Sequence, residues 1–145
     1  MLLPSLAFAE DAPTLDSGNT AWMMMSTALV FLMTPAGLAL FYSGMTRSKN
    51  VLNTYAMVLM AFTVTFVVWI AVGYSIAFGT NESAGLQTVM GGFGNMFLSG
   101  ISWTDLTSVG SYPTYVFVVV QGTFAARTVA IASGSVIERI KFSTW

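Results

Sequence analysis

Three long stretches of the chain are almost free of charged side chains. They cover residues 21–43, 51–78 and 112–137, and the one charge among them is Arg127 in the third. A helix rises about 1.5 Å per residue, so each stretch is long enough to cross a hydrocarbon core about 30 Å thick. Pro35 and Gly37 interrupt the first stretch, but membrane helices tolerate both where the freed backbone groups find partners. The pattern predicts an all-α membrane protein with three transmembrane helices.

The segments that connect these stretches differ in charge. Four basic residues lie between the first two stretches and after the third: Arg47, Lys49, Arg139 and Lys141. The intervening segment 79–111 contains no Lys or Arg. Because basic loops stay on the cytoplasmic side, we expect the N-terminus and segment 79–111 to lie outside. The prediction is a multi-pass protein of the inner cell membrane.

The first nine residues are typical of the end of a secretory signal peptide. A short apolar run leads into Ala7-Phe8-Ala9, an A-x-A cleavage pattern, and acidic residues follow. The positively charged opening of such a signal is missing, and a frayed apolar N-terminus is the alternative. We therefore expect residues 1–9 to be a signal-peptide remnant and residues 10–145 to form one membrane domain.

The predicted outer loop, residues 79–111, is rich in Gly and Ser. Its apolar run 90–101 is too short to span a bilayer and is interrupted by glycines. The aromatic residues Phe93, Phe97 and Trp103 are unusual for a disordered segment. We expect a partly helical cover that is interfacial or re-entrant, with a disordered loop as the alternative.

The composition excludes several classes of function. The chain of 145 residues is 55% hydrophobic and 8% charged, which leaves too little charged surface for a soluble protein. A net charge of −1 gives no reason to expect nucleic acid as a partner. The absence of Cys and His removes thiol nucleophiles, imidazole bases and His- or Cys-ligated metals. We expect no enzymatic activity, no metal and no cofactor.

The third stretch contains the candidate chemistry. At helical spacing, one face collects its polar and aromatic positions: Gln121, Phe124, Arg127 or Thr128, Ser135 and Glu138. Such a face must meet protein or a water-filled path, because lipid cannot form hydrogen bonds. The alternative is hydrogen bonding between helices, without a path. A second face, formed by Ala126, Ala130 and Gly134, is suited to close helix packing.

Arg127 is the anomaly of this stretch. It lies ten residues, or roughly 15 Å, from the end of the stretch at Ile137, close to the bilayer midplane. Insertion scales give an arginine there a cost of about 2.5–3.5 kcal/mol. It needs a carboxylate, carbonyl oxygens or water, and we expect its partner to come from helices outside this chain. The observation favours a functional site, and an incidental substitution is the alternative.

Three segments of the chain together match the pattern of one family of membrane proteins. Residues 27–53 read TALVFLMTPAGLALFYSGMTRSKNVLN and are similar to the first helix and first cytoplasmic loop of the ammonium transporter family (Amt/Mep/Rh). Residues 69–79 read WIAVGYSIAFG and resemble the end of the second helix. Residues 121–145 read QGTFAARTVAIASGSVIERIKFSTW and resemble the third helix. The order and spacing of the segments make the resemblance specific.

The resemblance implies the N-terminal part of an eleven-helix transporter, built as two inverted halves and assembled as a homotrimer. It implies ammonium or ammonia as substrate, nitrogen uptake as the role, and a cytoplasmic regulatory protein as a possible partner. Phe124 matches the family's gate phenylalanine, and Gln121 and Arg127 are further candidates for the substrate path. Val120 stands where the family often has an aromatic residue. Two alternatives stay open: an ammonium-sensing receptor domain and an inactive remnant.

Overall fold

The computed structural model describes residues 14–107 and 110–145, so the predicted signal-peptide remnant lies outside the described residues. Within this part of the chain, every regular element is a helix, and one antiparallel bridge joins Leu106 to Pro113. Three helical spans are long and apolar enough to cross a membrane: Ser17–Met45, Ser48–Phe78 and Thr114–Ser135. The predicted all-α architecture with three apolar spans is confirmed.

The first span consists of α1 (Ser17–Leu32), a π-helical turn (Met33–Leu38) and α2 (Ala39–Met45). It begins at Ser17 rather than at residue 21, because the Asp16 side chain caps the helix by accepting the backbone N–H of Asn19. The π-helical turn contains Pro35, which has no backbone N–H to donate. In this turn the N–H of Ala39 bonds to the Thr34 carbonyl oxygen, five residues back, so the helix continues past the proline.

The second span follows a short 3₁₀ turn, Ser48–Asn50. It consists of α3 (Val51–Val68), a second π-helical turn (Trp69–Gly73) and α4 (Tyr74–Phe78). The N–H of Tyr74 bonds to the Trp69 carbonyl oxygen, again five residues back. This wider turn carries the indole of Trp69, which becomes important at the third span.

The third span consists of α6 (Thr114–Ala132) and a 3₁₀ turn (Ser133–Ser135). Pro113 immediately precedes α6, where its missing N–H costs nothing. The helix ends at Ser135 rather than at residue 137. Beyond it, Glu138 has a left-handed backbone conformation with φ of 64°, which no helix residue adopts.

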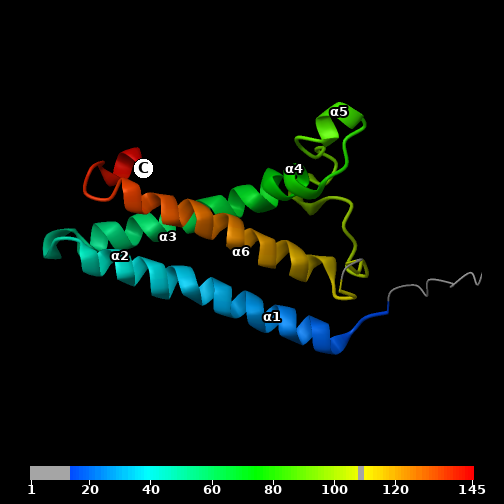
Figure 1. Ribbon diagram of the computed structural model, residues 1–145, viewed down its shortest axis with the longest axis horizontal. Helices are drawn as coiled ribbons and strands as arrows, with labels where there is room; N and C mark the ends of the chain where they lie inside the picture. Colours follow the sequence, from blue (N-terminus) through cyan, green and yellow to red (C-terminus); the bar gives the residue numbers. More distant parts are fainter. Residues whose placement is uncertain (1–13, 108–109) are drawn as a thin grey trace, which may run out of the picture.

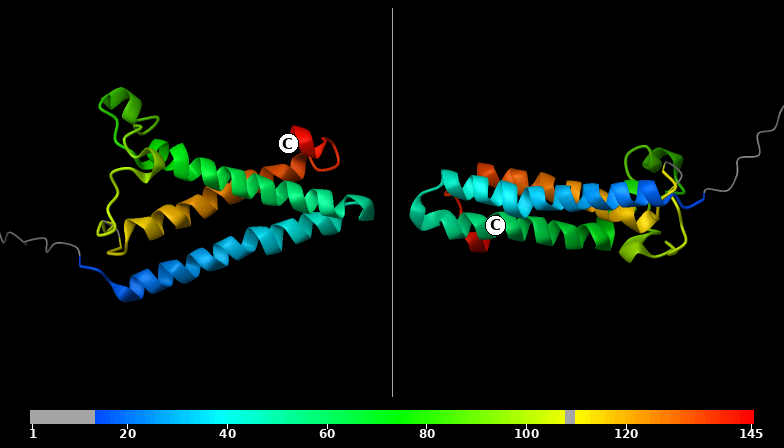
Figure 2. Two further views of the ribbon diagram at one scale, coloured as in Figure 1. Left: turned by 180° about the vertical axis from the view of Figure 1, so that it is seen from behind. Right: turned by 90° about the horizontal axis from the view of Figure 1, so that it is seen from below.

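The three spans form a splayed bundle. The first and second spans meet at the Ser48–Asn50 turn and diverge toward the other end. Helix α6 begins between them at the open end and crosses the second span toward the C-terminus (Figures 1 and 2). The core is a small cluster in the narrow part of the bundle, formed by Ala39, Val58, Phe62, Ala126 and Ala130. Two of the small residues predicted to pack closely on α6, Ala126 and Ala130, are fully buried there. Close packing of helices in lipid depends on such small side chains.

The segment between the second and third spans folds against the end of α4. It contains α5 (Ala84–Gln87) and a 3₁₀ turn (Met96–Leu98), and it lies at the end of the bundle opposite the C-terminus (Figure 1). Gly91 donates its backbone N–H to the Ile76 carbonyl oxygen at 2.7 Å. The buried Ser75 hydroxyl donates to the Gly92 carbonyl oxygen at 2.7 Å and accepts the N–H of Asn95 at 3.0 Å. The apolar run 90–101 is therefore attached to the second span and does not form a span of its own.

Candidate substrate path along the third span

Helix α6 places the three candidate path residues on consecutive turns. Phe124 is 39% exposed although it lies in the middle of an apolar helix. Gln121 and Arg127 are half-buried on either side of it along the helix. The face that carries Phe124 is thus left uncovered by the described residues, whereas the opposite face packs into the core.

Contacts with the second span fix the rotation of α6. The indole Nε1–H of Trp69 donates to the Val118 carbonyl oxygen at 3.0 Å. Gly122 makes this approach possible, because a Cβ there would lie 2.7 Å from Trp69 Cδ1 and 2.9 Å from Phe66 Cε2. Neither Trp69 nor Gly122 was predicted to be a functional residue. The glycine within the QGTF segment is the only signal of this contact in the sequence.

Arg127 turns toward the first span and toward Phe124. Its guanidinium carbon lies 4.8 Å from the centroid of the Phe124 ring. Its Nη1–H donates to the Met33 thioether sulfur at 3.1 Å. Within the described residues, Arg127 contacts a π face and a weak sulfur acceptor of its own chain. Neither contact neutralises its charge. The partner expected from helices outside this chain stays a prediction.

A groove between the first span and α6 surrounds the guanidinium. Its volume is about 570 Å³, and it is lined by Met33, Gly37, Leu38, Phe41, Arg127 and Ile131. The lining is apolar apart from Arg127. The three spans contain no Asp or Glu, so no carboxylate of the spans shares this depth with the guanidinium. Arg127 is a positive charge held in apolar surroundings.

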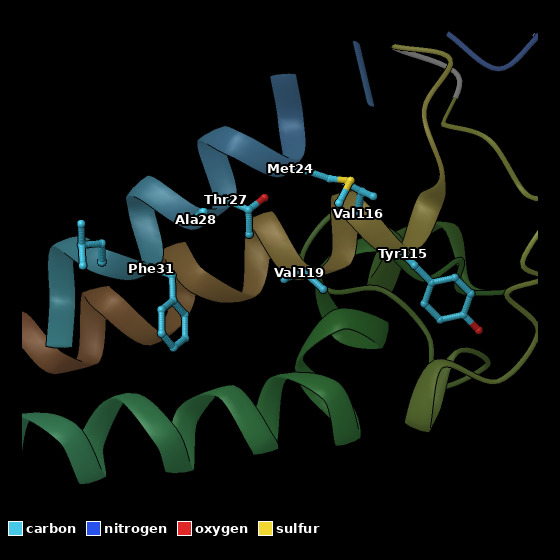
Figure 3. Close-up of a pocket in the computed structure, with 8 residues that line it drawn as sticks. Met24, Thr27, Ala28, Phe31, Tyr115, Val116 and Val119 are labelled. Carbon is cyan, nitrogen blue, oxygen red and sulfur yellow. The ribbon is translucent and has the colours of Figure 1, made fainter. Parts of the chain in front are cut away.

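A second groove lies nearer the start of both helices. Its volume is about 540 Å³, and it is lined by Met24, Ala28 and Phe31 of the first span and by Tyr115, Val116 and Val119 of α6. The Met24 side chain points toward Val116, whereas the Tyr115 ring points away from the first span (Figure 3). Val120, which stands where the resemblance leads one to expect an aromatic residue, is buried in the bundle. It therefore adds nothing to the exposed face.

The predicted polar face of α6 does not continue to Glu138, so this assignment was wrong. The helix ends before that residue, and the chain turns so that the carboxylate reaches the first connecting turn. Glu138 Oε1 accepts the backbone N–H of Arg47 at 3.1 Å and the Asn50 side-chain N–H at 2.9 Å. The hydrogen bonds from Asn50 and Arg47 lower the pKa of Glu138. Glu138 joins the two basic segments and is not part of a path.

Comparison with known proteins identifies the family. Residues 21–145 match the Ammonium Transporter Family, and the chain belongs to it. It is 44% identical over 146 residues to an ammonium transporter of Aquifex aeolicus, covering 99% of this chain and 33% of that protein. It is 44% identical over 135 residues to a putative ammonium transporter of Methanothermobacter thermautotrophicus, covering 90% of this chain and 31% of that protein.

A third relative is ammonium transporter Amt1 of Archaeoglobus fulgidus, 39% identical over 131 residues, or 90% of this chain and 30% of that protein. The chain thus spans about a third of the length of these relatives. The family is one of membrane transporters and not of enzymes, and the resemblance seen in the sequence is confirmed.

Proposed function

We propose that this chain contributes three spans to a transport path for ammonium or ammonia across the inner cell membrane. In this proposal it is the N-terminal part of an eleven-helix subunit of a homotrimer that serves nitrogen uptake. Its N-terminus lies outside, because Arg47, Lys49, Arg139 and Lys141 all belong to segments at the opposite end of the bundle (Figure 1).

One observation carries the proposal: a chain of this family keeps the face of α6 around Phe124 open. A phenylalanine that is 39% exposed within a span requires cover by lipid or protein, or else it borders a path. The aromatic ring attracts a cation by its π face, and the apolar walls around it penalise charge. We assign Phe124 the role of gate and place Gln121 and Arg127 beside the path.

A chimera tests this function. The segment of the Aquifex aeolicus relative that matches this chain would be replaced by residues 1–145, and the chimera expressed in cells that lack their own ammonium transporters. We expect saturable uptake of radiolabelled methylammonium that ammonium competes with, as in the unaltered relative. A chimera that reaches the membrane at the level of the relative and takes up no methylammonium would contradict the proposal.

The role of Phe124 is tested in the same chimera. Phe124→Ala should change the rate or the selectivity of methylammonium uptake by tenfold or more, because it removes the ring that would narrow the path. Val129→Ala is the matched control, since Val129 lies on the same helix and is also 39% exposed. Equal uptake by both variants would remove Phe124 from the path.

Ammonium sensing is a second candidate function, and the position of Arg127 favours it. Its guanidinium already lies over the Phe124 ring at 4.8 Å, which opposes passage of a cation. A sensor would pass its signal to a cytoplasmic regulatory protein, and the turn joined by Glu138 lies at the end of the bundle where such a protein would bind. A chimera that binds methylammonium and does not transport it would favour sensing over transport.

A further inference from the structure

The guanidinium of Arg127 occupies the kind of site that an ammonium ion would use. A cation binds an aromatic ring when it lies over the face within about 6 Å of the centroid. Arg127 meets this condition at Phe124, with 4.8 Å between the guanidinium carbon and the ring centroid. The π face of the candidate gate is therefore occupied by a cation of the protein itself.

The structure holds this cation in place. The hydrogen bond from Nη1 to the Met33 sulfur, at 3.1 Å, ties the guanidinium to the π-helical turn of the first span. The other side chains that line the groove are apolar. Met33 is the first residue of this turn, which also contains Pro35.

The guanidinium of Arg127 carries a positive charge. The spans provide no carboxylate that could neutralise it. Because the guanidinium lies over one face of the Phe124 ring, a second cation could bind only the other face, about 10 Å from the guanidinium. With an effective dielectric constant of about 20, this repulsion corresponds to a penalty of roughly ten- to twentyfold in occupancy.

We propose that Arg127 is a specificity-determining residue that acts as a built-in cation filter: it occupies the Phe124 ring, excludes ammonium ion there, and leaves the neutral amine as the form that passes. The inference rests on the proposed transport function. A neutral molecule feels no charge repulsion from the guanidinium, and its size alone decides whether it passes. The filter differs from a gate made only of apolar rings. Such a gate would bind both the ammonium ion and the neutral amine.

The test uses the chimera in proteoliposomes and measures two quantities in parallel: uptake of radiolabelled methylammonium and the current after a jump in ammonium concentration. Arg127→Met removes the charge and keeps an unbranched side chain, whereas Arg127→Lys keeps the charge. We expect the ratio of current to uptake to rise by ten- to hundredfold in Arg127→Met and to stay near that of the parent chimera in Arg127→Lys.

Three further variants sharpen the result. Met33→Leu keeps the volume but removes the sulfur acceptor, and we expect a smaller rise in the same ratio. Ile131→Ala opens the same groove without changing its charge and should leave the ratio unchanged. Arg127→Gln serves the same purpose as Arg127→Met if that variant does not accumulate in the membrane.

The outcomes separate the inference from the proposed function. An unchanged ratio in Arg127→Met and Arg127→Gln, or an equal rise in Arg127→Lys, would overturn the filter while leaving transport intact. A parent chimera without uptake that gains an ammonium current in Arg127→Met would show that Arg127 blocks both forms, and would overturn the filter together with transport by the native sequence. Absence of uptake and current in every variant would overturn both.

Discussion

The indole of Trp69 donates a hydrogen bond to the Val118 carbonyl oxygen and lies directly over Gly122. This contact joins the π-helical turn of the second span to the middle of the third. It also determines which face of α6 packs inward, because Val118 and Gly122 lie on the buried side. The exposure of Phe124 is thus a consequence of where Trp69 binds.

Replacing Gly122 by alanine should destabilise the bundle. The added Cβ would lie 2.7 Å from Trp69 Cδ1 and 2.9 Å from Phe66 Cε2, so two aromatic rings would have to move. Overpacking of this kind costs about 1–3 kcal/mol. The measurement is thermal unfolding of the chain in detergent, followed by far-ultraviolet circular dichroism.

Gly44→Ala is the matched control for this substitution. Gly44 lies within α2, and a Cβ there would meet nothing within 4 Å. Because alanine has a higher helix propensity than glycine, this variant should unfold at the same or a slightly higher temperature. An equal fall in unfolding temperature in both variants would show that Gly122 matters for its backbone conformation and not for the close approach of Trp69 and Phe66.

Trp69→Phe should weaken the contact between the second span and α6 while keeping an aromatic ring in the same place. A phenylalanine keeps an aromatic ring beside Tyr74 and Phe78 but removes the Nε1–H that bonds to Val118. The loss of one such hydrogen bond costs about 0.5–1.5 kcal/mol. Trp103→Phe is the control, since Trp103 is 83% exposed and stacks on Tyr115. An equally large fall in unfolding temperature for Trp103→Phe would contradict the assignment.

The sequence was sufficient to predict the architecture because hydrophobic length is a local property. Three uninterrupted apolar stretches predict three spans whatever their packing, and Arg47 and Arg139 mark the connecting segments. The π-helical turn at Pro35 was not predicted, because the rule that membrane helices tolerate proline does not say how the backbone adjusts. Met33 begins this turn, so its contact with Arg127 was not predicted either.

The candidate site could be predicted only in part. The resemblance placed Phe124 and Arg127 in one helix, and their spacing is compatible with contact. The role of Glu138 was missed, because helical periodicity was extended three residues beyond the end of the helix at Ser135. Its true partners, Arg47 and Asn50, are distant in sequence, and no local pattern connects them to a carboxylate after the third span.

Glu138 should make the stability of the bundle depend on pH. Its hydrogen bonds lower the pKa in the folded state, so the folded chain binds a proton less readily than the unfolded chain. The contribution is complete above the ordinary pKa of a glutamate, 4.5, and is lost as the pH falls through the lower pKa of the folded state. The unfolding temperature of the native chain should therefore fall in this acidic range.

The comparison for this effect is Glu138→Gln, which cannot titrate. At pH 7 this variant should have a lower unfolding temperature than the native chain. On acidification its unfolding temperature should fall by fewer degrees than that of the native chain. Glu82→Gln, at an exposed position of the outer segment, should behave as the native chain does. The prediction is wrong if the native chain and Glu138→Gln lose the same number of degrees between pH 6 and pH 3.

The last prediction concerns the close contact between the backbones of Gly79 and Gly92, which we call the crossing. The atoms nearest to an added Cβ there belong to the backbone, so no side chain can rotate to make room for it. A Cβ at Gly92 would lie 2.1 Å from the Thr80 carbonyl oxygen, which is backbone. Gly92→Ala should therefore displace the outer segment from α4 and break the hydrogen bonds of Ser75 to Gly92 and Asn95. Loss of about 3 kcal/mol of local stability corresponds to a fall of roughly hundredfold in amide protection.

Hydrogen exchange resolved to this peptide measures the effect, with the amide of Asn95 as the reporter. Gly94→Ala is the control two residues away, where a Cβ would meet nothing within 4 Å. Exchange in α3 should be unchanged in both variants, because the crossing holds the outer segment and not the core cluster. If Gly94→Ala exposed the Asn95 amide as strongly as Gly92→Ala, the close contact at Gly92 would not be what holds the outer segment to the second span. The effect would then come from the conformational flexibility of glycine in this segment.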